Sequence, residues 1–296
     1  MTNHNHETIN QQKKPNHTMK TNKLLKSIML GSLCAVALLA YAEQDKVINI
    51  YSRGKVISTY SMGGIDHFQV EDATPAKVTT YEVNGVSFDM VEVEGGNYLM
   101  GDDNSERSNE MPAHKETIPT FHIGKTEVTQ ELWEAVMGTN PSQFKGEANL
   151  PVERVTWTDC NTFISKLNEL TGKNFRLPSE PEWEYAARGG NKSQGFTYPG
   201  SDNVDEVVWY RENSGDKTHP VAQKQPNELG IYDMGGNVLE WTSDKYSDNY
   251  SSSRTDSDRC DRGGGYSNSP LGVLFTYRHH VQESYTGGNL GLRLAL

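Results

Sequence analysis

Helical patterns end early in this chain, and the long remainder without them limits the fold more than any other feature. Apolar residues recur at helical spacing, between a capping residue and a glycine, in 128–138, 159–172 and 179–190. More than a third of the chain follows Gly190, rich in Gly, Ser, Asn and Tyr and interrupted by short apolar clusters at 207–210 and 273–277. This distribution predicts an α+β domain that is rich in loops and has few regular elements.

The expected helix starts are marked by side chains that accept hydrogen bonds from free backbone N–H groups. Thr129 is the expected N-cap of the first helix, and Asp159 is the expected start of the second. Ser179, followed three residues later by Glu182, forms a capping box for the third. Each helix pattern stops at a glycine, the residue that most readily adopts the left-handed conformation of a C-terminal cap.

Strand patterns precede the helices and set the domain boundaries. Residues 86–101 form two apolar runs around a Gly-Gly turn, 102–114 are a polar loop, and 120–129 have the pattern of another strand. Residues 47–71 alternate apolar and polar side chains around Arg53-Gly54-Lys55, which predicts a short β-ribbon. We therefore expect an N-terminal extension and signal peptide at 1–42, a β-ribbon and linker at 43–80, and the main domain at 81–296.

The first 42 residues carry the pattern of an export signal. Residues 20–26 are basic, 27–39 are apolar, and Ala40-Tyr41-Ala42 places small residues where a signal peptidase reads. The pattern predicts a secreted protein of the periplasm or cell surface that is not an integral membrane protein after cleavage. A lipoprotein anchored at Cys34 is disfavoured because the bulky Leu33 precedes that cysteine. The polar residues before Met19 leave both Met1 and Met19 open as the start.

The net charge limits the kinds of binding partner, and the cysteine content limits the possible disulfides. The chain has 28 Lys and Arg against 39 Asp and Glu, a net charge of −11. No basic stripe is evident, so we expect no nucleic-acid partner. Cleavage of the signal leaves Cys160 and Cys260, for which a disulfide and two buried thiols are both open.

Seven sequence blocks follow one another along the main domain. They begin with VEVEGGNYLMGDD, TFHIGKTEVTQELWEAVMGTNPSQF and PVERVTWTDCNTFISKLN, and continue with FRLPSEPEWEYAARGG, HPVAQKQPNELGIYDMGGNVLEW, RGGGY and NLGLRLAL. The set resembles the formylglycine-generating-enzyme or sulfatase-modifying-factor domain family over about residues 86–296. The resemblance implies a variant of the C-type lectin fold, in agreement with the loop-rich pattern.

The resemblance also implies where catalytic residues should lie. The family's oxidase activity converts a sulfatase cysteine to formylglycine with copper held by two cysteine thiolates, which lie shortly after an RGGS-type turn. The matching segment 263–278 contains no cysteine, and Cys260 lies before the turn. We therefore expect no catalytic residue, no other cofactor-binding residue and no copper. A formylglycine-generating oxidase with a different arrangement stays open as the alternative.

Two further features separate this chain from its relatives. By alignment, the cystines of some relatives fall on Ile164 with Leu294 and on Ala187 with Phe275, where this chain has apolar side chains that packing can accommodate. Iron-dependent relatives use a His-rich site in an added helical domain, and no such domain or H-x₃-H cluster is present in this sequence. The adjacent His279 and His280 are therefore interpreted as a solvated surface pair.

The stretch DMGGNVLEW at 233–241 is the candidate metal site. In relatives that this chain resembles, calcium binds around the motif that here occupies 236–241. Calcium prefers hard oxygen ligands, and a turn built from glycine can aim carbonyl, amide and carboxylate oxygens at one ion. The predicted ligands of a structural calcium ion are Gly236, Asn237, Val238 and Glu240. The alternative is a capped turn in which Glu240 accepts hydrogen bonds from backbone N–H groups.

Segment 266–289 is the candidate binding surface. It is rich in Ser, Asn, Tyr, Gly and His, residue types that suit adaptable contact surfaces. The same C-terminal region displays ligand-contacting side chains in the lectin-fold relatives that serve as variable receptors, and ordinary loop polarity is the alternative. The predicted function is therefore non-catalytic: binding of a protein, peptide or glycan, or a role in cell-envelope assembly.

Overall fold

The computed structural model describes residues 27–29, 36–38, 40–42, 47–52, 55–61, 77–250 and 258–296. The chain divides into one unit at 1–74 and a second at 75–296. The first unit contains β1 (Ser27–Met29) paired with β2 (Val36–Leu38), and a sheet of β3 (Ala40–Ala42), β4 (Val47–Ser52) and β5 (Lys55–Ser61). Strands β4 and β5 pair antiparallel, with Ser52 opposite Lys55. The predicted basic segment 20–26 and Cys34 lie outside the described residues.

The second unit contains three small sheets. The first has the order β10-β7-β6, from β6 (Val78–Val83), β7 (Val86–Val93) and β10 (Phe121–Gly124). The second pairs β8 (Gly96–Met100) with β9 (His114–Ile118). The third has the order β13-β12-β11-β14, from β11 (Leu239–Lys245), β12 (Asp258–Arg262), β13 (Arg278–Gln282) and β14 (Leu290–Leu292). Strand β6 begins inside the predicted linker, and β9 has no counterpart among the predicted strands.

The helices begin at side-chain caps. Helix α1 (Gln130–Met137) starts after Thr129, and α3 (Glu180–Ala187) starts after the capping box of Ser179 and Glu182, as predicted. Helix α2 (Trp157–Thr171) starts two residues earlier than predicted, because Thr156 is the N-cap and Asp159 is the third helical residue of its capping box. Sequence patterns did not indicate α4 (Val204–Val207) or the 3₁₀ helices Ser108–Glu110, Gly190–Lys192 and Pro270–Gly272.

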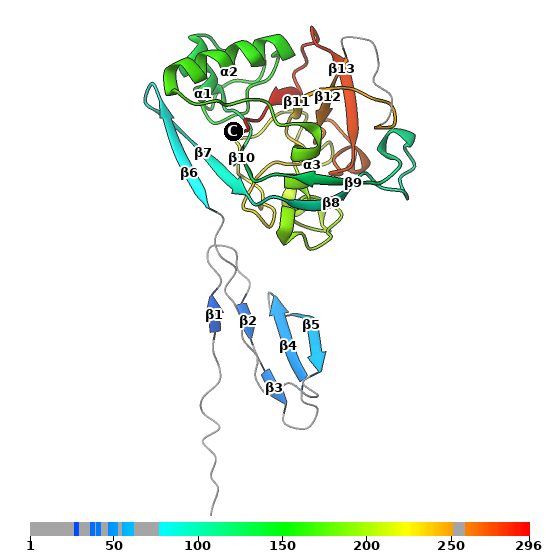
Figure 1. Ribbon diagram of the computed structural model, residues 1–296. Helices are drawn as coiled ribbons and strands as arrows, with labels where there is room; N and C mark the ends of the chain where they lie inside the picture. Colours follow the sequence, from blue (N-terminus) through cyan, green and yellow to red (C-terminus); the bar gives the residue numbers. More distant parts are fainter. Residues whose placement is uncertain are drawn as a thin grey trace, which may run out of the picture. The chain divides into compact units, whose positions relative to one another are not determined.

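Two apolar cores hold the second unit together. Figure 1 shows α1 and α2 side by side, in contact with β6 and β7, and α3 nearer to β8 and β9. The core under α1 and α2 includes Ile164 and Leu294, and the core around α3 includes Ala187, against which Phe275 packs. Each of the two residue pairs that align with a cystine of some relatives therefore lies within a single core. Apolar packing takes the place of the disulfide at both positions.

The last residues of the chain join several elements. Strand β14 runs parallel to β11, with Leu292 opposite Trp241. Ala295 forms isolated antiparallel β-bridges with Ile123 of β10 and with Arg176, which lies before α3. Among the residues that the structure describes, no helix has the length and apolar character needed to cross a membrane.

Candidate functional site

The turn at 233–241 is shaped by its backbone conformation. Gly236 and Asn237 both have positive φ, at 76° and 56°. A side chain at Gly236 would collide with the carbonyl oxygen of Trp209, so glycine is required there by space as well as by φ. The Asn237 N–H donates to that same carbonyl at 2.9 Å, which fixes the turn against the segment after α4.

Asn237 is fully buried, and both the oxygen and the nitrogen of its side-chain amide make hydrogen bonds. Its Oδ1 accepts from the His219 N–H at 2.9 Å, and its Nδ2 donates to the His219 carbonyl at 3.1 Å and to Glu127 Oε2 at 3.2 Å. The Val238 N–H donates to Glu127 Oε1 at 3.3 Å. Asn237 therefore acts as a bridge between two segments that are far apart in sequence.

Glu240 is equally buried and is held by an arginine. Its two carboxylate oxygens accept four hydrogen bonds: three from Arg293, at 2.6, 2.9 and 3.1 Å, and one from Trp183 Nε1, at 2.7 Å. The capped-turn alternative places backbone N–H groups at this carboxylate, whereas the donors in the structure are a guanidinium and an indole. We call Glu127, Asp233, Asn237, Glu240 and Arg293 the turn cluster.

The predicted calcium ligands therefore already have partners. A cation can reach the Glu240 carboxylate only by displacing the guanidinium of Arg293, and the Asn237 amide oxygen already accepts a backbone N–H. Within the described part of the chain, no three His, Cys, Asp or Glu side chains gather in a metal-binding arrangement. Calcium at Gly236, Asn237, Val238 and Glu240 stays a prediction that these contacts do not support.

The turn cluster has more carboxyl groups than cations. Burial, with the neighbouring Asp233 and Glu240 carboxylates, raises the pKa of Glu127 well above its ordinary value. Burial likewise raises the pKa of Asp233 to about 6. Protonation of these carboxyls relieves the excess negative charge without an added ion.

A second group of buried charges lies between α3 and the third sheet. Arg262 binds Glu180 at 2.8 Å and Glu184 at 2.6 Å. Arg278 binds both oxygens of Glu180, at 2.6 and 2.8 Å, and Arg188 binds the remaining oxygen of Glu184 at 2.7 Å. These five residues, Glu180, Glu184, Arg188, Arg262 and Arg278, form the helix cluster.

The helix cluster was missed by sequence reasoning. Glu180 and Glu184 lie one turn apart in α3, and both side chains are buried. Burial alone would raise the pKa of Glu180, yet Arg262 and Arg278 lower it to about 2. The sequence signal that could have found the cluster is the four-residue spacing of Glu180 and Glu184, which places both acids on the same side of α3.

Both remaining cysteines are buried free thiols, which decides between the two possibilities left open above. Cys160 lies in α2 and Cys260 in β12, each 0% exposed. Burial raises the pKa of both thiols well above the ordinary value. Neither is a thiolate at neutral pH, so the two residues do not fit a copper site that needs a pair of thiolates.

The histidine pair is not simply solvated. His279 Nδ1 lies 2.9 Å from Asp261, and His280 Nδ1 lies 2.8 Å from Asp258. The two side chains are 39% and 29% exposed, and His280 also stacks on Tyr246. The prediction of a solvated pair was wrong because each imidazole faces a carboxylate on the neighbouring strand β12.

The C-terminal segment 266–289 is partly buried and partly exposed. Leu271 and Tyr285 are 56% and 46% exposed and are the large hydrophobic side chains that this segment presents to solvent. A pocket of about 420 Å³ opens beside Tyr285, with His280 and Ser284 among its lining residues. We call 266–289 the C-terminal face.

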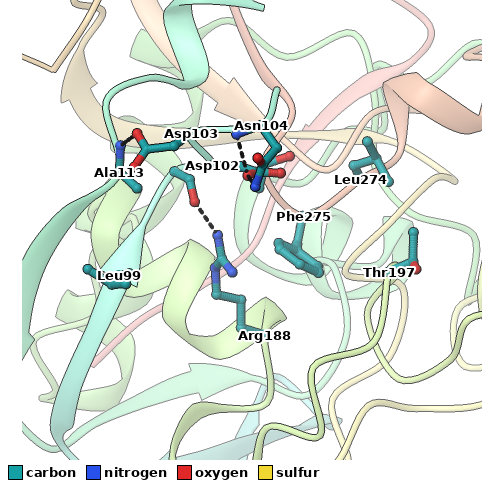
Figure 2. Close-up of a pocket in the computed structure, with 11 residues that line it drawn as sticks. Leu99, Asp102, Asp103, Asn104, Ala113, Arg188, Thr197, Leu274 and Phe275 are labelled. Carbon is teal, nitrogen blue, oxygen red and sulfur yellow. Dashed lines mark hydrogen bonds between the residues drawn. The ribbon is translucent and has the colours of Figure 1, made fainter. Parts of the chain in front are cut away.

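Another pocket, of about 540 Å³, is shown in Figure 2. One side comes from Leu99 of β8 and the following loop at 101–104, and the other from Arg188 and residues 274–276. Segment 263–278, where the family's oxidases carry cysteines, therefore contributes Leu274, Phe275 and Thr276 to this wall. None of these side chains supplies a nucleophilic thiol.

Comparison with known proteins places the second unit in a family. Residues 75–296 match the sulfatase-modifying factor enzyme 1-like domain. The chaperone protein LppX of Paenibacillus barcinonensis is 38% identical over 259 residues, covering 71% of this chain and 89% of LppX. The inactive C-alpha-formylglycine-generating enzyme 2 of Bos taurus is 27% identical over 225 residues, covering 55% of this chain and 73% of that protein.

A solved structure gives the same result. Treponema denticola variable protein 1 matches with a TM-score of 0.68 and 31% sequence identity, over 74% of this chain and 98% of its own. These matches confirm the predicted resemblance and the α+β, C-type lectin-like fold. The chain belongs to the sulfatase-modifying factor enzyme 1-like domain family.

Proposed function

We propose that this protein binds a polypeptide partner without modifying it and that the C-terminal face is the contact surface. The observation that carries the proposal is the state of the two thiols: both are fully buried, and burial raises the pKa of each. Without an accessible thiolate pair, the copper-dependent oxidation of a sulfatase cysteine has no ligand set.

The relatives support the choice of a polypeptide. LppX is named a chaperone, a class of protein that binds other polypeptides, and the bovine relative is named inactive. The C-terminal face offers exposed apolar side chains, Leu271 and Tyr285, among polar Ser, Asn and Gln. Such a mixture suits adaptable contact with an extended chain.

Mass spectrometry tests the non-catalytic part. The full chain is co-expressed with a sulfatase that carries the cysteine motif, and the sulfatase peptide is examined for the aldehyde. We expect unconverted cysteine. Conversion that requires this protein would overturn the proposal in favour of a formylglycine-generating oxidase.

Site-specific crosslinking tests the binding part. A photoreactive amino acid replaces Tyr285 in the C-terminal face, and in a matched control it replaces Leu170 on α2, which is similarly exposed at 53%. We expect covalent polypeptide adducts from position 285 in intact cells and few from position 170. Equal yields from the two positions would show that the face has no preference for a partner.

The export pattern adds a location to this proposal. Residues 20–42 predict transfer to the periplasm or cell surface, where an envelope-assembly role would be carried out. Fractionation of cells that express the full chain, compared with a variant that lacks 20–42, tests this. Equal retention of both forms in the cytoplasm would contradict the location.

A structural calcium ion is the remaining part of the hypothesis. An ion at the turn cluster would have to displace Arg293 from Glu240, or rely on backbone carbonyls alone. Thermal unfolding with and without a chelator decides the matter. A melting temperature that does not change on chelation removes calcium from the proposed function.

A further inference from the structure

The pocket in Figure 2 has the volume of a small-ligand site, at about 540 Å³. Its lining combines one arginine, a pair of aspartates and several apolar side chains. Nothing in the proposed function requires this combination.

Arg188 is held rigidly at the pocket wall. Its Nε and Nη2 donate to Glu184 Oε1 at 2.9 and 2.7 Å, and its Nη2 also donates to the Gly101 carbonyl at 2.8 Å. The guanidinium lies 4.3 Å from the centre of the Phe275 ring. Figure 2 shows it between Leu99 and Phe275. Its Nη1 makes no hydrogen bond to any residue that the structure describes.

The helix cluster has one more arginine than carboxylates, and the extra positive charge reaches the pocket. Three guanidinium groups face two carboxylates, and guanidinium groups do not lose their protons. The side chains of Arg262 and Arg278 are 0% and 1% exposed, whereas that of Arg188 is 22% exposed. Arg188 therefore carries the positive charge of the helix cluster to the pocket, where the Asp102 and Asp103 carboxylates also lie, so the lining offers partners for both ends of a zwitterion.

The remaining walls offer an acceptor and an apolar surface. Asp102 Oδ1 accepts from the backbone and the side chain of Asn104, at 2.8 and 3.3 Å, and its other oxygen has no partner within the described ranges. Leu99 is 56% exposed, and Leu274 and Phe275 lie on the opposite wall. A ligand with an anion, an N–H group and an apolar substituent would satisfy all three elements.

We propose that this pocket binds an amino-acid unit through its α-carboxylate, as a free amino acid or as the C-terminal residue of a polypeptide. Arg188 Nη1 donates to the carboxylate in a charge-assisted hydrogen bond. Asp102 accepts from the ligand's ammonium or amide N–H, and the apolar side chain packs against Leu274 and Phe275. For a polypeptide end, this inference rests on the proposed function and specifies which part of the partner is recognised.

Calorimetric titration of the full chain with three probes tests the proposal. N-acetyl-L-phenylalanine mimics a chain terminus, L-phenylalanine is the free amino acid, and L-phenylalaninamide lacks the carboxylate. We expect at least one of the two acids to bind at least tenfold more tightly than the amide. Tighter binding of the acetylated acid identifies the chain terminus, and tighter binding of L-phenylalanine identifies the free amino acid. Equal binding of acids and amide, or no binding of either acid, overturns the proposal.

Variants connect the result to the pocket. Arg188→Gln should reduce the ratio of acid to amide affinity to about one, a readout that a purely structural role for Arg188 would leave unchanged. Because Glu184 loses a partner in that variant, Arg188→Lys provides a second form that keeps the charge. Glu134→Gln, in a different pocket, is the control that should keep the full ratio. An unchanged ratio in both Arg188 variants refutes the proposal.

The result is separable from the proposed function. Crosslinking at position 285 reports on the C-terminal face and does not depend on occupancy of this pocket. A titration without binding, together with strong crosslinking, would refute the pocket proposal alone. Binding of the acids without crosslinking would refute the proposed contact surface alone.

Discussion

The turn cluster and the helix cluster are built from the same residue types but have opposite imbalances. The turn cluster sets three carboxyl groups against Arg293, and its charged side chains belong to residues that are at most 4% exposed. The helix cluster sets two carboxylates against three arginines, one of which reaches the solvent. The turn cluster is shielded from solvent, whereas the helix cluster reaches a solvent-accessible pocket through Arg188.

The sign of the imbalance explains the difference. Excess carboxyl groups can take up protons, as the raised pKa values of Glu127 and Asp233 indicate, so the turn cluster can remain sealed. An arginine has no such response, since it stays charged at any physiological pH. Excess arginine must therefore face water or an anion, and Arg188 does so at the pocket wall.

The largest effect should come from removing Arg293. Arg293→Met leaves the buried Glu240 carboxylate without a cation, and we expect it to lose about 3–5 kcal/mol of unfolding free energy. Arg262→Met should lose less, because Arg278 still pairs with Glu180 and Arg188 still pairs with Glu184. Urea denaturation at pH 7 measures the loss. The control is Arg176→Met, which removes a guanidinium that is 43% exposed and should cost about 1 kcal/mol or less. Losses as small as the control's would mean that the clusters do not hold the fold.

The pH dependence of stability should differ between the clusters. Asp233 has a folded pKa of about 6 against an ordinary 3.8, so its stabilising contribution is present below about pH 4 and is lost as pH rises through 6. Glu180 has a folded pKa of about 2 against 4.5, so its contribution is present above about pH 4.5 and is lost as pH falls towards 2.

Asp233→Asn isolates the first of these terms. Asn keeps an acceptor for the Ala222 N–H and tolerates the positive φ of this position. We expect the variant to lose the decline in unfolding free energy between pH 4 and 6, on the order of 1–3 kcal/mol. Denaturation series across this range in both proteins provide the measurement. Parallel curves would show that Asp233 does not titrate in the folded state as described.

Glycine substitutions sharpen the role of backbone shape in the turn. Gly236 and Gly138 have the same φ of 76°, but a side chain at Gly138 meets open space, whereas one at Gly236 meets the Trp209 carbonyl. Gly138→Ala should cost about 1 kcal/mol through the left-handed backbone alone. Gly236→Ala should cost about 1–2 kcal/mol more, through the collision. Thermal unfolding of the two variants gives the difference between their losses of stability. Equal losses for Gly138→Ala and Gly236→Ala would contradict the steric argument.

The smallest expected effect concerns His279, which lies outside both clusters. A hydrogen bond to Asp261 raises the pKa of His279. Its contribution is therefore complete below the unfolded pKa of about 6.5 and is lost as pH rises through the higher folded value. His279→Gln should lose about 1 kcal/mol or less at pH 5.5 and less at pH 8.5, because the imidazole is partly exposed. A larger loss at the higher pH would contradict this sign.

Sequence patterns predicted what depends on neighbours along the chain. The caps at Thr129 and Ser179 are local hydrogen-bonding patterns, and both helices begin where those patterns placed them. The ordered blocks of the main domain were long enough to identify the family.

What could not be predicted depends on partners far away in sequence. Nothing near Glu240 indicates that Arg293 will bind it, and nothing near Glu184 indicates Arg188 and Arg262 together. Residues that can bind calcium in one setting are the same residues that bind a guanidinium in another. Strand β9 was missed for a related reason, because its polar side chains give little alternation and its pairing with β8 supplies the structure.

Residues 290–296 connect elements that lie far apart in sequence. Leu296 exchanges two backbone hydrogen bonds with His122, Leu294 accepts one from Gly124, and Ala295 exchanges two with Arg176. Without residues 290–296, β11 would lose its parallel partner, and the core under α1 and α2 would lose Leu290, Leu292 and Leu294. The core around α3 contains no residue of this segment, so the two cores differ in their dependence on it.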